Sequence, residues 1–232
     1  MKYLFIYFRH APLTGGDKMM TNYFDKILLN PKNDPTEIYE FYKSQLKLIS
    51  AVNEYLPKET HFIMKDATHM LFLESILKIF PDACIIHTFR SIESVIGSTC
   101  SAFFNILEIY HEINENNIQK KKFDLAIRVV YFYYQCTRRW MSFIVKNKPK
   151  NVFFCDFNDL VSNPVFTVKR IYKFFGFLFT SQMEEKIKYF LEEDNKKRKQ
   201  KHLYSIKEYG LNSQILDILF GKYISFCKEM KN

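Results

Sequence analysis

The sequence predicts an α/β domain with a parallel sheet, and two observations support this. Between residues 62 and 100, short apolar runs alternate with segments whose apolar residues repeat at helical spacing. Such alternation is typical of parallel strands joined by crossover helices, because a tight hairpin cannot join parallel neighbours. The chain is also 47% hydrophobic and 17% aromatic, which is sufficient for one core. We therefore expect a single domain over residues 1–232.

The N-terminal part is expected to contribute a strand and a supporting helix. Residues 3–8 are apolar and aromatic, as in a strand, and the Pro and Gly-Gly content of residues 11–18 predicts a loop. Asp34 and Pro35 fit an N-cap followed by proline at the first helical position, so a helix should run to about Leu56. Its apolar residues keep the helical period and should face the core: Ile38, Phe41, Tyr42, Leu46, Ile49 and Val52.

The central and C-terminal parts supply the remaining elements. Strands are expected at residues 62–64, 83–89 and 152–155, each an apolar run that ends at a polar turn. Helices are expected at residues 68–80, from Arg90 to about Glu112, and at 123–146, 163–176, 181–191 and 211–232. Ser181 and Glu184 fit a capping box, and residues 195–201 form a basic run.

Polar residues gather where the first two of these strands end. Ligands of open parallel sheets lie outside the carboxyl ends of the strands. There the sequence places Lys65, Asp66, Thr68, His69, Arg90, Ser91 and Ser98. A cation after each strand, followed at once by a helix N-terminus, suits a multiply phosphorylated ligand.

Three blocks of the sequence resemble the bacterial-type sulfotransferases that use 3'-phosphoadenosine 5'-phosphosulfate (PAPS). The first contains Lys65-Asp-Ala-Thr-His69, the string FPDA, and Ser98 eight positions after Arg90. In the family a Lys-x-Pro-x-His turn stands at the first of these places, so an alanine replaces the usual proline. Residues 152–176 resemble the family's strand, DLV-x-(D/N)-P turn and helix, and residues 202–211 resemble its basic, Tyr-containing C-terminal loop.

The resemblance implies a three-layer α/β/α fold of the P-loop nucleotide-kinase-like type. It also implies transfer of a sulfuryl group from PAPS to a hydroxyl or amine, with no metal. Arg90 and Ser98 would bind the 3'-phosphate, and Lys65 would assist the transfer. The basic C-terminal loop would contribute further contacts to the nucleotide from Lys199, Lys201 and Tyr204. Two alternatives stay open: Arg90 could be a strand-end arginine in a surface ion pair, and Lys65 could be a solvated surface lysine.

His69 is the candidate general base. An imidazole at the start of a helix, beside Lys65, could take the proton from an acceptor hydroxyl. Asp66 is the weaker alternative for the general base. A purely structural role for His69 also stays open.

The family's N-terminal phosphate-binding loop has no counterpart here. Such enzymes begin with a strand and a loop of roughly Pro-Arg-Ser-Gly-Thr-Thr, and this string does not occur in the chain. We therefore expect an N-terminally truncated fold, whose sheet needs residues 3–8 or a second chain to fill the gap. Two alternative functions stay open: a catalytically inactive relative that binds nucleotide or polyanion, and a basic nucleic-acid-binding module that acts through residues 195–201.

Charge and composition narrow the class of partner. The net charge of +9 suits an anionic ligand, and we rank a small-molecule or glycan acceptor above nucleic acid, with a homo-oligomer left open. The five cysteines lack C-x-x-C spacing and the six histidines lack ligand pairing, so we expect buried cysteines and no metal site. No uncharged run reaches membrane-spanning length and no signal peptide is recognisable, so we expect a cytoplasmic protein.

Overall fold

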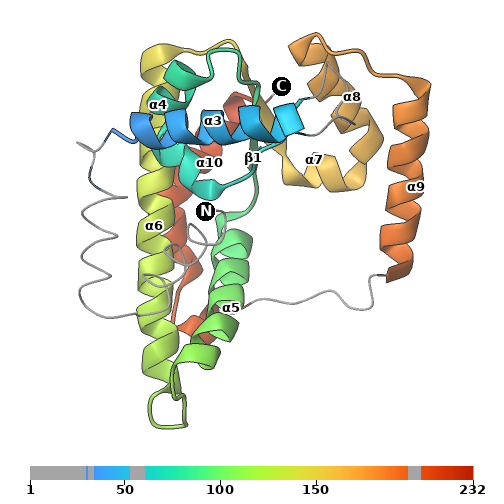
Figure 1. Cartoon of the computed structure of the whole chain (residues 1–232). Coiled ribbons are helices and arrows are strands. Elements are labelled where there is room, and N and C mark those ends of the chain that lie inside the picture. Colours follow the sequence, from blue (N-terminus) through green and yellow to red (C-terminus); the bar gives the residue numbers. More distant parts are fainter. Residues whose placement is uncertain (1–29, 31–33, 53–60, 198–204, 232) are drawn as a thin grey trace.

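The computed structural model describes residues 30, 34–52, 61–197 and 205–231. The strand expected at residues 3–8 lies outside these ranges, as do Lys199, Lys201 and Tyr204. Within them the chain forms a two-stranded parallel sheet with helices on both sides (Figure 1). The predicted fold class, α/β with a parallel sheet, is therefore confirmed.

The sheet consists of β1 (Ile85–Phe89) and β2 (Val152–Asp156). The strands are in register, with the first residue of β1 opposite the first residue of β2. The crossover between them contains α5 (Ile92–Tyr110) and α6 (Ile118–Asn147). A long helical connection of this kind is what parallel neighbours require.

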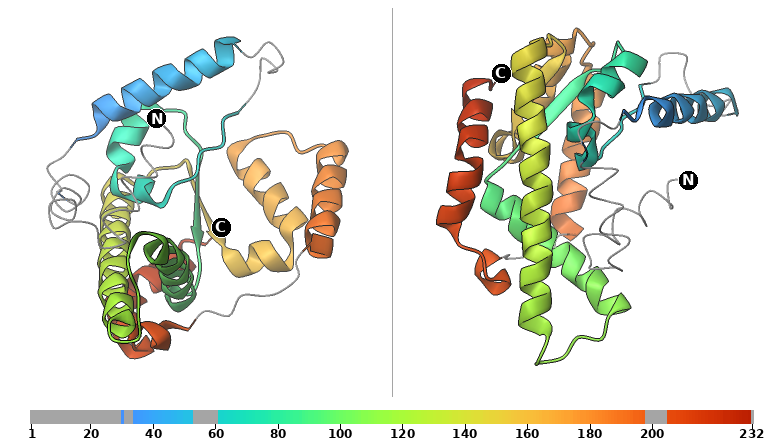
Figure 2. Two further views of the ribbon diagram at one scale, coloured as in Figure 1. Left: turned by 60° about the horizontal axis from the view of Figure 1, so that its bottom comes forward. Right: turned by 90° about the vertical axis from the view of Figure 1, so that its left-hand side faces the viewer.

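The other described helices surround this unit (Figures 1 and 2). Helices α6 and α10 pack side by side on one side of the sheet, and α7, α8 and α9 lie on the other. Helix α3 lies on the outside of α4. The bounds are α3 (Thr36–Val52), η1 (Ala67–Leu71), α4 (Leu73–Ile79), α7 (Phe157–Ser162), α8 (Pro164–Phe175), α9 (Ser181–Lys197), η2 (Ile206–Tyr209) and α10 (Ser213–Glu229).

The two faces of β2 are covered by different helices, because alternate side chains of a strand point to opposite faces. Val152 and Phe154 pack against α6 and α10 in one hydrophobic cluster. Phe153 and Cys155 pack against α8 in another. On that second face, β1 is more open, and Ile86 is 47% exposed.

The largest hydrophobic cluster lies between α5, α6, η2 and α10. Six of its residues have no solvent exposure (0%): Ile96, Cys100, Ala126, Val129, Cys136 and Phe220. Among the described helices, α5 alone is long and apolar enough to cross a membrane by length and composition. In this structure its apolar side chains form the core that joins the crossover helices.

The strand expected at residues 62–64 is wrong. Residues 61–66 have no regular secondary structure, and Ile63 is 95% exposed. A strand requires a hydrogen-bonded neighbour, and in the described part of the chain the only ladder joins β1 to β2. An apolar run of this length does not form a strand without such a partner.

The single helix expected at residues 68–80 is also wrong, because the chain breaks at Phe72 (φ −133°, ψ 31°) into η1 and α4. The break has a packing reason. Leu71 enters the α5–α6 cluster, whereas Leu73 enters the cluster under the sheet. In a continuous helix these two side chains would point to opposite sides, about 200° apart.

Further differences concern element ends and cysteines. Helix α6 begins before residue 123, and α9 extends beyond residue 191. The cap of α9 is Thr180 rather than Ser181, since the Thr180 Oγ1 accepts from the Met183 N–H at 3.2 Å. The short helices α7 and η2 were not anticipated. Cys84 is exposed, while the other cysteines are buried as expected.

Helix α3 contacts the molecule along one edge of the expected stripe, where Tyr42 is half-buried, and most of the stripe is exposed. Ile38 and Phe41 are each 49% exposed and Val52 is 71% exposed, although their spacing predicted a core-facing stripe. Instead Tyr39 is buried, and it packs with Ile76 of α4. The tyrosine face is preferred because the Tyr39 hydroxyl also finds a polar partner beneath it, described below.

Candidate functional site

The candidate site lies at the carboxyl ends of β1 and β2. The chain leaves β1 through Arg90 and leaves β2 through Phe157. The Arg90 guanidinium stacks on the Phe157 ring, with 4.6 Å between Cζ and the ring centroid. A cation–π contact of this kind holds the plane of a guanidinium while its edge keeps N–H donors. The two strand ends are thereby linked through one partly buried cation.

Arg90 makes no ion pair with any described residue, so the alternative of a surface ion pair is not observed there. The described ion pairs involve other cations, such as Lys146 with Glu74 and Lys231 with Asp159. A half-buried guanidinium without a carboxylate is able to receive an anionic ligand.

Ser98 lies on α5, the helix that follows Arg90 after one residue. It is partly exposed, and at 1.5 Å rise per residue it lies about 9 Å along the axis from Ile92. Ser91 is the N-cap of α5, but its side chain makes no capping hydrogen bond. Arg90 and Ser98 thus belong to one strand–helix unit, and their joint role as phosphate ligands stays a prediction.

The second group of predicted residues surrounds the start of η1. Asp66 is its N-cap: Oδ1 accepts from the Thr68 N–H at 2.7 Å and from the Thr68 hydroxyl at 2.6 Å. This capping role engages the carboxylate that was the alternative base. Lys65 precedes it with an exposed side chain. Leu71 of η1 packs in the same hydrophobic cluster as Ile92 of α5, and η1 itself packs mainly against α6.

His69 forms a hydrogen bond with Tyr39, a residue that the sequence did not single out. Its Nδ1 lies 3.0 Å from the hydroxyl of Tyr39 on α3, and the two ring centroids are 5.9 Å apart. Burial, and secondarily the charge of Asp66, raise the pKa of the Tyr39 phenol well above its usual range. Tyr39 therefore keeps its hydrogen at any physiological pH. The only sequence signal was a second tyrosine placed just beside the apolar stripe of α3.

A second histidine, His87, lies inside the core and not at the site. Its Nε2 is 2.9 Å from the Tyr223 hydroxyl, and its ring stacks on Trp140 with centroids 3.9 Å apart. Burial lowers the pKa of His87 to about 3. This histidine is a neutral structural group.

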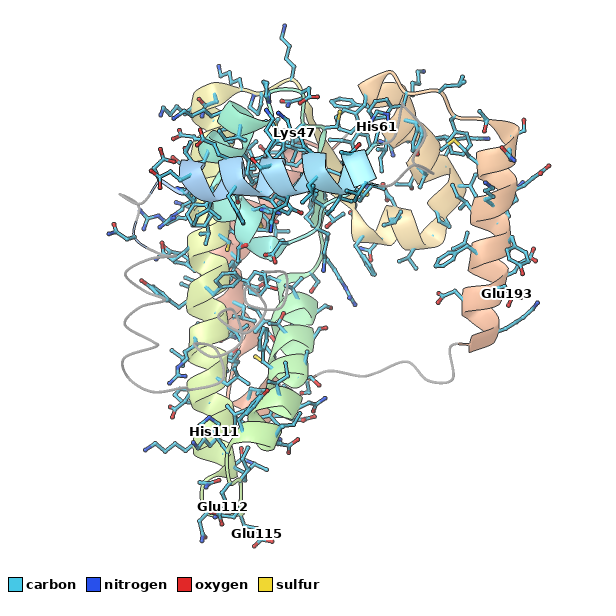
Figure 3. All side chains as sticks on the ribbon, in the orientation of Figure 1. Lys47, His61, His111, Glu112, Glu115 and Glu193 are labelled. Carbon is cyan, nitrogen blue, oxygen red and sulfur yellow. The ribbon has the colours of Figure 1, made fainter. Side chains whose placement is uncertain are left out.

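Other titratable groups are spread over the molecule. Figure 3 shows His111, Glu112 and Glu115 at the tip where α5 leads into α6, far from the strand ends. It also shows His61 beside α8, where its ring centroid lies 4.7 Å from that of Phe177. Within the described ranges no group of three or more His, Cys, Asp or Glu has a metal-binding arrangement.

A cavity of about 580 Å³ lies at the other end of the sheet. Its walls are mostly apolar, and it is lined by Ile144, Val145, Lys148, Pro149, Lys150, Val152, Phe154, Phe174, Phe226 and Met230. Since Val152 begins β2 whereas Arg90 follows the end of β1, this cavity is separate from the candidate site.

Comparison with known proteins identifies the family. No curated protein matches the sequence. The fold resembles sulfotransferase STF1 from Mycobacterium tuberculosis H37Rv (TM-score 0.55, 20% identity, 71% of this chain and 40% of that one). It also resembles sulfotransferase STF9 from Mycobacterium avium (TM-score 0.69, 20% identity, 84% of this chain and 47% of that one). The chain thus spans less than half the length of either structure. A family model described as "Sulfotransferase family" matches residues 14–181, which is most of the sequence, and the chain belongs to that family.

Proposed function

We propose that the chain transfers a sulfuryl group from PAPS to a hydroxyl or amine of a small-molecule or glycan acceptor. Family membership supports a transferase. The observation that carries the proposal is Arg90: a guanidinium at the end of β1, stacked on Phe157, with no carboxylate partner in the described part of the chain.

Arg90 and Ser98 would hold the 3'-phosphate of the donor. A guanidinium donates two parallel hydrogen bonds to a phosphate, which fixes both position and orientation. The Ser98 hydroxyl, on the helix that begins beside Arg90, would add a further donor. This pair would bind the nucleotide without taking part in bond breaking.

Lys65 would act on the transferred group. The acceptor oxygen or nitrogen bonds to sulfur while the bond between sulfur and the bridging oxygen of the 5'-phosphate breaks, and the acceptor proton is lost to a base or to water. Negative charge develops on the bridging oxygen, where the Lys65 ammonium would stabilise it. His69 stands four residues further along the same turn, and its role depends on which ring nitrogen carries hydrogen.

A second candidate function is nucleotide binding without transfer. It is favoured by one observation, namely that the string Pro-Arg-Ser-Gly-Thr-Thr is missing from the sequence. Such a protein would bind the 3'-phosphate through Arg90 as well, and would differ from an enzyme only in lacking turnover.

Calorimetric titration with 3'-phosphoadenosine 5'-phosphate, the product nucleotide, tests the proposed site. We expect micromolar binding that weakens about 10- to 100-fold in Arg90→Ala, since a hydrogen bond to a charged group contributes about 1.5–3 kcal/mol. Arg138→Ala is the matched control, because Arg138 is an exposed arginine of α6 and should leave binding unchanged. No binding by the folded wild type would overturn the proposal. Binding followed by sulfate transfer from PAPS would separate the enzyme from the binding protein.

A further inference from the structure

The Tyr39 hydroxyl has a single hydrogen-bond partner in the described structure, the Nδ1 atom of His69 at 3.0 Å. Tyr39 is 8% exposed, and its ring packs with Ile76 and Ile79 of α4. The hydroxyl that contacts His69 therefore belongs to a buried side chain.

Helix α3 is fixed on α4 at a second point, one turn further along. The Lys43 ammonium donates to the carbonyl oxygen of Ile79 at 2.9 Å and lies 5.7 Å from the centroid of the Phe80 ring. Residues four apart in a helix lie on the same face. Tyr39 and Lys43 thus anchor one face of α3 on α4. These contacts keep the Tyr39 hydroxyl next to His69.

Two arrangements of hydrogen are conceivable in this contact. In one, the Tyr39 O–H donates to a lone pair on Nδ1. In the other, an Nδ1–H group of His69 donates to the phenol oxygen, and the tyrosine hydrogen then needs a second acceptor. Among the described residues Tyr39 has no second acceptor, and a buried donor left unsatisfied costs about 1–3 kcal/mol. The raised pKa of the phenol, caused mainly by burial, keeps the O–H in place. The first arrangement is the one that satisfies both groups.

We propose that Tyr39 is a positioning residue that holds neutral His69 in the tautomer with hydrogen on Nε2. A neutral imidazole has one N–H and one lone pair, and the bond made by one nitrogen decides the state of the other. Because Tyr39 occupies the lone pair on Nδ1, the opposite nitrogen is a donor.

This assignment changes the chemistry expected of His69. A ring with hydrogen on Nε2 cannot take the acceptor proton at that atom, so His69 is not the general base. It is instead a hydrogen-bond donor suited to an anionic oxygen of the sulfuryl or phosphate groups, four residues after Lys65 in the sequence. This last step rests on the proposed function, whereas the tautomer itself does not.

The tautomer is measurable by NMR without any substrate. In long-range ¹H–¹⁵N spectra of the labelled chain at about pH 8.5, above the ordinary histidine pKa of about 6.5, we expect His69 to show a protonated Nε2 and an unprotonated Nδ1. Loss of its signals in His69→Gln assigns them among the six histidines. Tyr39→Phe keeps the ring and removes the O–H, and should convert His69 to a mixture of tautomers.

Tyr42→Phe is the matched control for that experiment. Tyr42 lies on α3 three residues further along and packs partly buried against the same cluster, but it is the Tyr39 hydroxyl that contacts Nδ1 of His69. It should leave the His69 pattern unchanged. A wild-type ring with hydrogen on Nδ1, or an unchanged pattern in Tyr39→Phe, would overturn the proposal.

An activity comparison tests the donor role separately. In a PAPS transfer assay, His69→Gln places an amide N–H near the position of Nε2, whereas His69→Ala removes the donor. A donor role predicts that His69→Gln keeps at least about tenfold more activity than His69→Ala, the equivalent of one hydrogen bond. Equal inactivity would contradict the donor role. If the wild type shows no transfer at all, the proposed function fails, and the NMR result still decides the tautomer.

Discussion

Two histidines of this chain each bond to a tyrosine hydroxyl, and the comparison separates a structural pair from a functional candidate. The His87–Tyr223 and His69–Tyr39 contacts have nearly the same length, 2.9 and 3.0 Å. His87 is 5% exposed and stacks on Trp140, whereas His69 is only partly buried in the polar turn at the start of η1. The hydrogen bond is common to both, so the depth at which each ring is buried is what distinguishes the two histidines.

The buried pair should depend strongly on its aromatic neighbour. Trp140→Ala removes a side chain that is 1% exposed and that covers the His87 ring, so we expect a loss of about 3–5 kcal/mol in the free energy of unfolding. Urea denaturation measures it. Tyr131→Ala, at a 47% exposed position of the same helix, should cost less than about 1 kcal/mol. Similar losses in the two variants would show that the His87 pocket is not tightly packed.

The buried pair should also make the fold sensitive to acid. The pKa of His87 is about 3 in the folded chain, whereas an unfolded histidine titrates near 6.5. Between these values the unfolded chain binds more protons, so stability is complete above about pH 6.5 and falls as the pH drops toward 3, by up to about 1.4 kcal/mol per pH unit.

The difference between wild type and His87→Phe isolates this contribution from that of the carboxylates. Urea midpoints taken from pH 7 to pH 4 should fall more steeply for the wild type than for His87→Phe. Parallel curves would contradict a neutral, buried His87.

Removing each tyrosine hydroxyl should lower stability by a different amount. Tyr223→Phe leaves a buried ring nitrogen of His87 without its tyrosine partner and should cost about 1–3 kcal/mol of stability. Tyr39→Phe should cost only about 0.5–1.5 kcal/mol, because water can reach the partly exposed His69. Thermal unfolding of both variants measures these losses of stability. Equal losses of stability would remove the distinction between the two pairs.

Local sequence signals were sufficient where a single segment determines its own structure. β1 and β2 are apolar runs bounded by polar turns. Helix α8 is capped by Asn163, whose side chain accepts from the Phe166 N–H, and ends at Gly176 with φ 72°, where a glycine is favoured. The end of β1, with Arg90 following it, could be placed on the same grounds.

The failures occurred where structure depends on distant partners. Residues 62–64 have strand-like composition but no neighbouring strand in the described chain. Helical periodicity showed that α3 has an apolar stripe, yet it could not show that α4 meets only the edge of this stripe, at Tyr39 and Tyr42. The contact of Tyr39 with His69 joins residues 30 positions apart, and no local pattern encodes which ring nitrogen is occupied.

The most direct test of this account is a titration of the labelled chain with 3'-phosphoadenosine 5'-phosphate, followed on the histidine side-chain NMR signals. We expect the His69 signals to shift and saturate with the Kd found by calorimetry, while the His87 signals stay in place. If the nucleotide leaves His69 unmoved, or shifts His87 equally, then the end of β1 and the η1 turn do not form one nucleotide site.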